Sequence, residues 1–233
     1  LTTAGNVTDS ALITVGGTTT IAANAGASDI TLDNGDGQYA VIELIAANAT
    51  VIDTAGNLDI GASAIGTNLT LTTAGNVTDS ATITVGGTTT IAANAGNSDI
   101  ILDEALSDYD TVELVGDTVT VTDVNGIDLG ASTITTSFTV TAGAAVTDSG
   151  TINADGIITQ INAAGFDITL DEEFSDYGTV ELLGLNVDVE DVDDIILGLS
   201  TITATFDLIA GGAVTDSAAV LVSGNATLTA RGQ

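Results

Sequence analysis

The stretch LTTAGNVTDS occupies residues 1–10 and returns unchanged at residues 71–80. Looser copies follow as TAGAAVTDS at 141–149 and IAGGAVTDS at 209–217. An unchanged internal copy indicates a repeated structural unit, and a repeat decides the fold class before any local feature does.

The repeat has a length of roughly 70 residues. Its most regular marker is the aspartate of each VTDS element, which recurs at an almost constant interval as Asp9, Asp79, Asp148 and Asp216. We expect the valine of each element to point inward. We interpret the chain as a single segment, 1–233, made of repeats at about 1–70, 71–139 and 140–207 and a partial repeat at 208–233.

A finer period lies inside each repeat. In the second copy, three pieces cover 69–87, 88–117 and 118–137. Each piece begins with an alternating run such as LTLTT, the pattern of a strand with one apolar face. Each run ends at a turn rich in Gly, Asn and Asp. Strands this short and this often interrupted leave no room for helices, so the sequence predicts an all-β fold.

Two all-β architectures compete, an antiparallel sandwich or barrel and a parallel β-helix. Successive strands of a sandwich occupy different environments, whereas each coil of a β-helix stacks on an equivalent coil. The repeat therefore favours a parallel β-helix, or β-solenoid. We expect about 20 residues per coil, three coils per repeat and roughly 10–11 coils in all.

The composition excludes several classes of function. The chain has 32 acidic residues, one basic residue and a net charge of −31, which argues against binding to nucleic acids and anionic membranes. No run approaches the roughly 20 apolar residues of a membrane span, so we expect no membrane insertion. With 44% hydrophobic residues the chain is too apolar for disorder. The absence of Met predicts an internal segment of a longer protein.

Two long stretches, 69–96 and 118–150, resemble the repeat regions of filamentous-haemagglutinin-like surface proteins, the long exported adhesins of bacteria. The resemblance extends over essentially the whole chain. It implies a right-handed parallel β-helix in an extracellular or cell-surface shaft that provides length and presentation. It further implies, as partners, more coils of the same chain or identical subunits stacked end to end, and no catalytic residues.

The middle piece of each repeat is the longest, and we expect an acidic insertion to lengthen it. This segment, called the acidic loop below, lies at 32–39, 102–110 and 170–177. Carboxylates in surface loops are ligands that Ca²⁺ prefers, but Asp in such loops also caps turns through the backbone. Both interpretations stay open. We expect that the protein requires no cofactor. If the loops bind an ion, the sequence indicates weak binding of Ca²⁺. The candidate ligands are Asp33, Asp36, Asp103, Glu104, Asp108, Asp110, Asp171, Glu172, Glu173 and Asp176.

A tyrosine stands at the same point of each acidic loop, at Tyr39, Tyr109 and Tyr177. The three rings fit either a row that stacks on sugars or a cover over the apolar seam of the loop. We expect the cover, with each hydroxyl in water.

The sequence predicts no enzyme. β-Helical lyases need a basic residue near a calcium-bound uronate, and the chain has only Arg231, close to its last residue. Hydrolases need two carboxylates at a set separation, and no unique motif surrounds the acidic run at 190–194. We expect a non-catalytic shaft or filament segment; the alternative is a solenoid that binds cations, a receptor or glycans through its acidic loops.

Overall fold

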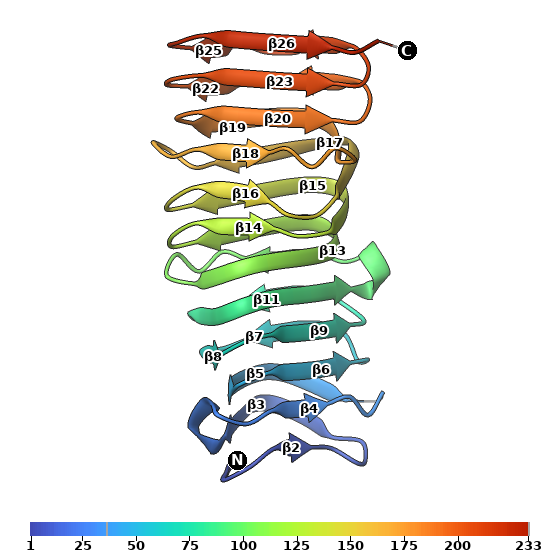
Figure 1. Ribbon diagram of the computed structural model, residues 1–233. Coiled ribbons are helices and arrows are strands. Elements are labelled where there is room, and N and C mark those ends of the chain that lie inside the picture. The colour runs from blue at the N-terminus through green and yellow to red at the C-terminus, as the bar shows by residue number, and fades with distance from the viewer. Residues whose placement is uncertain (36, 233) are drawn as a thin grey trace. The chain divides into compact units, whose positions relative to one another are not determined.

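The computed structural model describes residues 1–35 and 37–232. They form an all-β parallel β-solenoid of about 11 turns, with about 20 residues per turn and almost no helix (Figure 1). The predicted fold class is therefore confirmed. Contacts divide the chain into unit 1, Leu1–Thr122, and unit 2, Asp123–Gln233. No helix among the described residues is long and apolar enough to cross a membrane.

Unit 1 consists of short strands joined by tight turns. Two single-turn 3-10 helices interrupt it, η1 (Asn24–Gly26) and η2 (Asn94–Gly96). Its strands are β1 (Thr2–Thr3), β2 (Val7–Thr8), β3 (Thr14–Ala23), β4 (Ile30–Leu32), β5 (Gln38–Ala46), β6 (Ala49–Asp53), β7 (Leu58–Ile60), β8 (Ser63–Ile65), β9 (Leu69–Thr73), β10 (Val77–Asp79), β11 (Ile83–Ala93), β12 (Ile100–Leu102) and β13 (Asp108–Asp123), whose last residue belongs to unit 2.

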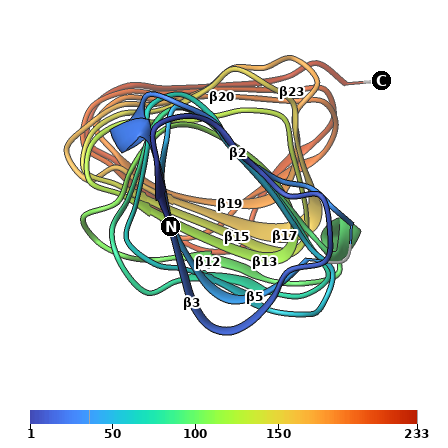
Figure 2. The same cartoon turned by 90° about the horizontal axis from the view of Figure 1, so that it is seen from below.

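Unit 2 has the same construction. Its strands are β14 (Ile127–Leu129), β15 (Ser132–Ala142), β16 (Val146–Asp148), β17 (Ile152–Asn162), β18 (Ile168–Leu170), β19 (Asp176–Gly184), β20 (Val187–Asp191), β21 (Ile195–Leu197), β22 (Ser200–Ile202), β23 (Phe206–Ala210), β24 (Val214–Asp216), β25 (Val220–Val222) and β26 (Ala226–Ala230). Each coil has three sides, as in β20, β21 and β22. Figure 2 shows β15, β17 and β19 on one side of unit 2 and β20 and β23 on another.

Parallel pairing carries the register from coil to coil. In unit 1 one ladder of paired residues runs through Val7, Ile30, Ala49, Leu69 and Thr89. The residues that precede the first four of these form a hydrogen-bonded column at the corner, and its steps are 23, 19 and 20 residues. The coils are therefore unequal in length, although every coil keeps the same pairing.

The acidic loop does not lengthen its coil, so that expectation is wrong. The longest step contains η1, where Asn24 and Ala25 adopt left-handed backbone. The acidic loop follows β4 and lies in the step of 19 residues. It fits there because β4 has 3 residues where its partner β6 has 5, so the loop replaces the end of a strand.

The repeat and the coil do not coincide. Three coils carry the ladder of unit 1 from Val7 to Leu69, whereas the equivalent of Val7 in the next repeat is Val77. Val77 lies on the next side, in a ladder with Leu58 and Ile100. One repeat thus corresponds to three coils and one further side, which refines the predicted three coils. Equivalent residues of successive repeats face different sides.

Unit 2 repeats this offset. Val146 pairs with Ile127 and Ile168 on the side of β16 and β18. Its equivalent Val214 pairs with Ile195 on the side of β21 and β24. The same sequence therefore serves on different sides, because every side needs the same alternation of inward apolar and outward polar residues.

The core of each unit is a stack of thin aliphatic layers. Val77 in unit 1 and Val146 in unit 2 are fully buried, and Val7 is 9% exposed, as the pattern predicts. Val214 in β24 is only half-buried. The largest fully buried side chains are Tyr109, Tyr177, Phe138 and Phe206. Full burial of a Val or Leu side chain contributes about 1.5–3 kcal/mol, so stability comes from many equal layers.

Polar side chains stack at the corners. In unit 1, Asn48 Nδ2 donates to Asp29 Oδ1 at 2.9 Å, and the backbone N–H of Asn68 donates to Asn48 Oδ1 at 3.3 Å. In unit 2, the backbone N–H of Asn186 donates to Asp167 Oδ1 at 3.1 Å. These aspartates join neighbouring coils, because a corner residue lies next to its equivalent in the coil before.

Candidate functional site

The start of each acidic loop is held by the VTDS aspartate of the preceding coil. In unit 2, Asp148 Oδ1 accepts the backbone N–H of Asp171 at 2.9 Å, and Oδ2 accepts that of Glu172 at 3.4 Å. In unit 1, Asp79 binds the N–H groups of Asp103 and Glu104 at 2.9 and 3.3 Å. The repeated motif is thus an anchor for the acidic loop.

The ends of the first and third acidic loops are held by an aspartate of the following coil. Asp191 Oδ2 accepts the N–H of Tyr177 at 2.7 Å, and Oδ1 accepts the N–H of Asp193 at 3.0 Å. Asp53 does the same for Tyr39 at 2.8 Å in unit 1. Each of these two aspartates thus caps the turn that follows it and also binds the tyrosine of the acidic loop.

The tyrosine hydroxyls do not lie in water, so that expectation is wrong. Tyr39, Tyr109 and Tyr177 are 3%, 0% and 0% exposed, and their hydroxyl oxygens are buried. Burial, followed by the charges of Asp9 and Asp53, raises the pKa of Tyr39. The ring is enclosed because aspartates of both neighbouring coils draw the acidic loop inward. Buried rings also exclude a sugar-stacking row.

Burial also raises the pKa values of the anchoring carboxyl groups. It raises the pKa of Asp79, Asp148 and Asp191 to about 6 each, although backbone N–H groups bonded to each carboxylate act in the opposite direction. In both units the charged carboxylate of the anchoring aspartate accepts these N–H hydrogen bonds, but the loss of hydration on burial disfavours the charged form. Near neutral pH these groups are therefore costly charges inside the stack.

The predicted calcium ligands do not converge. Among residues 1–35 and 37–232, no three acidic side chains are grouped so as to hold a metal ion. Asp36 lies outside the described residues. Asp108 and Asp110 lie at the start of β13, Asp176 begins β19, and Glu173 lies in the loop before it. The VTDS aspartates bind the backbone N–H groups of the remaining candidates, which are Asp33, Asp103, Glu104, Asp171 and Glu172. Calcium binding stays a prediction.

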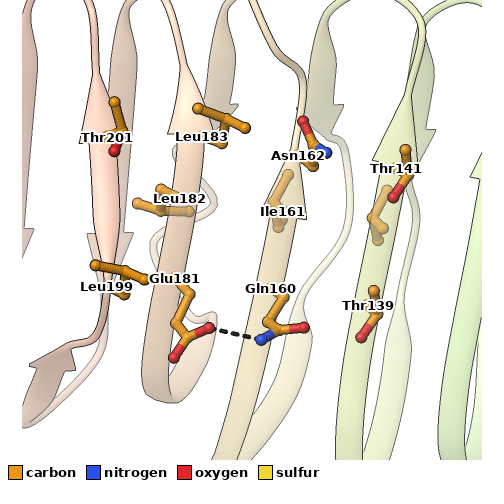
Figure 3. A pocket seen from close by; sticks show the side chains of 11 residues that line it. Thr139, Thr141, Gln160, Ile161, Asn162, Glu181, Leu182, Leu183, Leu199 and Thr201 are labelled. Carbon is orange, nitrogen blue, oxygen red and sulfur yellow. Dashed lines mark hydrogen bonds between the residues drawn. The ribbon is translucent and has the colours of Figure 1, made fainter. Parts of the chain in front are cut away.

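A shallow groove of about 320 Å³ lies on the outer face of unit 2, across β15, β17, β19 and β22 (Figure 3). Register places its outward side chains in two rows that cross the strands. The first row holds Thr139, Gln160 and Glu181, and the second holds Thr141, Asn162, Leu183 and Thr201. The rows exist because parallel strands bring alternate residues of successive coils to one face.

The carboxylate of Glu181 is the centre of the groove. Its Oε2 accepts a hydrogen bond from Gln160 Nε2 at 2.6 Å (Figure 3). The side chain lies over Gly198 of the next coil, where an added Cβ would stand 2.6 Å from Glu181 Cγ. Unit 1 has the same arrangement, in which Thr20 donates to Glu43 at 2.6 Å. A glycine at this point therefore leaves room for the glutamate side chain in both units.

Sequence reasoning missed this groove, although the repeats carry a signal for it. The third repeat has larger or more polar residues there than the first two. At equivalent positions stand Gln160 against Thr20 and Thr90, Asn162 against Ala22 and Ala92, and Leu199 against Ala62 and Ala131.

The comparisons with known proteins return one family. A family model described as repeats of unknown function (DUF5649) matches residues 1–41, 46–114, 116–182 and 184–233. The starts of the last three matches, 46, 116 and 184, follow nearly the same spacing as the VTDS markers. No curated protein and no solved structure matches the chain. These findings support a repeat-containing β-solenoid, and they leave the haemagglutinin-like identity untested.

Proposed function

The chain belongs to the family of repeats of unknown function (DUF5649), and from this premise we propose that it is a non-catalytic shaft or filament segment of an extracellular bacterial surface protein. The resemblance to filamentous-haemagglutinin-like adhesins supplies the location. Its partners are then further coils of the same chain or identical subunits stacked end to end.

The observation that carries the proposal is the parallel pairing of each coil with the next. In unit 2, all five residues of β20 pair with β23, and all five residues of β23 pair with β26 (Figure 1). Each coil offers the next a full set of backbone partners and an apolar layer. Such a unit extends by adding repeats and needs no other core.

The charge of the surface supports the same role. A net charge of −31 keeps neighbouring molecules apart and soluble, which suits a segment that only spaces other parts. The one basic residue, Arg231, is engaged with Glu190 at 2.7 Å. It is half exposed and reaches from the end of β26 past β23 to β20, so it serves packing more readily than lyase chemistry.

The proposal is tested by changing the number of repeats. We would insert a second copy of residues 71–139 in register and measure the largest dimension by small-angle X-ray scattering. The proposal predicts a gain of about 16 Å per added repeat, at about 4.8 Å per coil, with a constant cross-section. An increase of the cross-section, or no increase in length, would contradict it.

A further inference from the structure

We propose that the groove on β15, β17, β19 and β22 of unit 2 binds a neutral carbohydrate. The sugar lies against Gln160, Asn162 and Glu181, between the exposed side chains of Leu183 and Leu199. This binding role goes beyond the proposed shaft and does not depend on it.

The polar groups of the groove match sugar hydroxyls, which both donate and accept. Gln160 uses its amide nitrogen on Glu181, which leaves its carbonyl oxygen as an acceptor. Asn162 accepts the backbone N–H of Ala164 at 3.2 Å through Oδ1, which leaves its amide nitrogen as a donor. Glu181 has one oxygen engaged and one turned toward Gly198. Acceptors and donors thus alternate over the floor.

The apolar part of the groove fits the C–H face of a sugar ring. Leu183 is 37% exposed and Leu199 is 60% exposed, and both line the groove. A volume of about 320 Å³ lies at the lower end of the ~300–1,000 Å³ range of small-molecule sites, so it suits one or two sugar residues. No aromatic ring lines the groove, so we expect a dissociation constant on the order of 1 mM.

Charge selects among sugars. Glu181 lies in the groove, and the chain as a whole carries −31 with one basic residue. Uronates and sulfated sugars would meet repulsion without a cationic partner. The negative potential does not lower the affinity for neutral sugars.

The internal repeats show that shaft packing does not require the groove. The first two repeats keep the glutamate and the glycine but place Thr and Ala where the third places Gln160 and Asn162. They also place Ala where the third places Leu199. The first two repeats fold with the small residues, so the fold does not depend on the exposed leucine or on the two amides, and all three changes enlarge the contact with a ligand.

The test uses the full chain and three neutral trisaccharides, maltotriose, cellotriose and triacetylchitotriose. Side-chain amide signals of Gln160 and Asn162 are followed by ¹H–¹⁵N NMR up to about 20 mM sugar, well above the expected dissociation constant. We expect saturable shifts of both signals with at least one sugar. No shift with any of the three would overturn the proposal. Trigalacturonate is the anionic control, and equal binding of it would overturn the proposal too.

Variants taken from the chain's own repeats locate the site. The variants are followed through the backbone amide signal of Glu181, which all of them keep. Asn162→Ala should weaken binding about fivefold, the effect of one hydrogen bond, and Gln160→Thr with Asn162→Ala and Leu199→Ala should abolish it. Thr20→Ala removes the equivalent bond to Glu43 in unit 1 and should leave binding unchanged. Unchanged binding by the triple variant, or an equal loss with Thr20→Ala, would overturn the assignment. Melting temperatures check that every variant is folded.

Discussion

Asp148 accepts the backbone N–H of Asp171 at 2.9 Å, across 23 residues of chain and one coil of the solenoid. The aspartate of the repeated VTDS element therefore reaches out of its own coil. It fixes the point at which the acidic loop of the next coil begins. The repeated element therefore joins neighbouring coils, and this explains why the same ten residues occur twice.

Removing this anchor should destabilise unit 2. Asp148→Ala leaves the N–H groups of Asp171 and Glu172 without their acceptor, and we expect a loss of about 2 kcal/mol in the free energy of unfolding. Asp148→Asn keeps an acceptor oxygen without the buried charge and should lose less at pH 7. Urea denaturation measures both. Equal losses for Ala and Asn would show that the charge is what matters.

Stability should rise as the pH falls from about 7 to about 5. The pKa values of Asp79, Asp148 and Asp191 are raised to about 6, so the folded state holds these protons to a higher pH than the unfolded state does. Their contribution is full below the unfolded pKa, near 4, and is lost as the pH rises through about 6. Between pH 7 and pH 5 each group should contribute on the order of 1–2 kcal/mol.

Substitution separates this effect from the general relief of the negative charge. Asp148→Asn should flatten the dependence of the free energy of unfolding on pH between 4 and 7. Glu173→Gln, in the exposed part of the same loop, should shift the curve without changing its shape. A stability maximum at pH 8 in the parent chain would contradict the prediction.

An acidic residue at the core position of the motif should open the stack. Val77 is fully buried, and Val77→Asp places an unpaired charge between apolar layers, at a cost of several kcal/mol. Val77→Ala should cost about 2 kcal/mol, as cavity formation does. Thr72→Asp, on the exposed face of β9, lies opposite Ile52 and Ala92 and should stay within about 0.5 kcal/mol. Thermal melting compares the three, and an unchanged melting temperature for Val77→Asp would mean that the strand faces are assigned wrongly.

The fold could be predicted because its causes are local and repeated. Alternation of apolar and polar residues sets the strands, glycine and asparagine set the turns, and the repeat selects stacking over a sandwich. The long coil of the first repeat could not be predicted, because its added residues lie in the turn of η1 and not in the acidic loop. That turn depends on left-handed backbone at Asn24 and at Ala25, and alanine gives no signal for it. Coil lengths of 19 to 23 residues therefore appear only in the register.

The site could be predicted less well, because its partners lie in different coils. Tyr177 is enclosed by Asp148 of the preceding coil and by Asp191, which follows it by 14 residues. The groove joins Gln160 to Glu181, 21 residues further on, and to Thr139 of the coil before. No motif within a strand contains such a pair.

Calcium should act as a loose counterion of this surface. The carboxylates of the acidic loops do not converge on one point among the described residues, so Ca²⁺ and Mg²⁺ at equal concentration should raise the melting temperature by similar amounts. Calorimetric titration should give no saturable heat with either ion. Saturable heat with Ca²⁺ alone would instead establish a specific site and favour the cation-binding alternative.

Gly198 should be intolerant of a side chain because of Glu181. In Gly198→Ala the new Cβ would meet Glu181 Cγ at 2.6 Å and Thr179 Cγ2 at 3.2 Å, and we expect a loss of about 1–3 kcal/mol. Glu181→Ala removes the closer contact, so Gly198→Ala should cost much less in that background. The double-mutant cycle from urea denaturation then gives a coupling of at least about 0.5 kcal/mol. Additive losses would mean that contacts with the backbone, and not with Glu181, require glycine at this position. Gly61→Ala with Glu43→Ala is the matched cycle in unit 1, where the same contact is 2.8 Å.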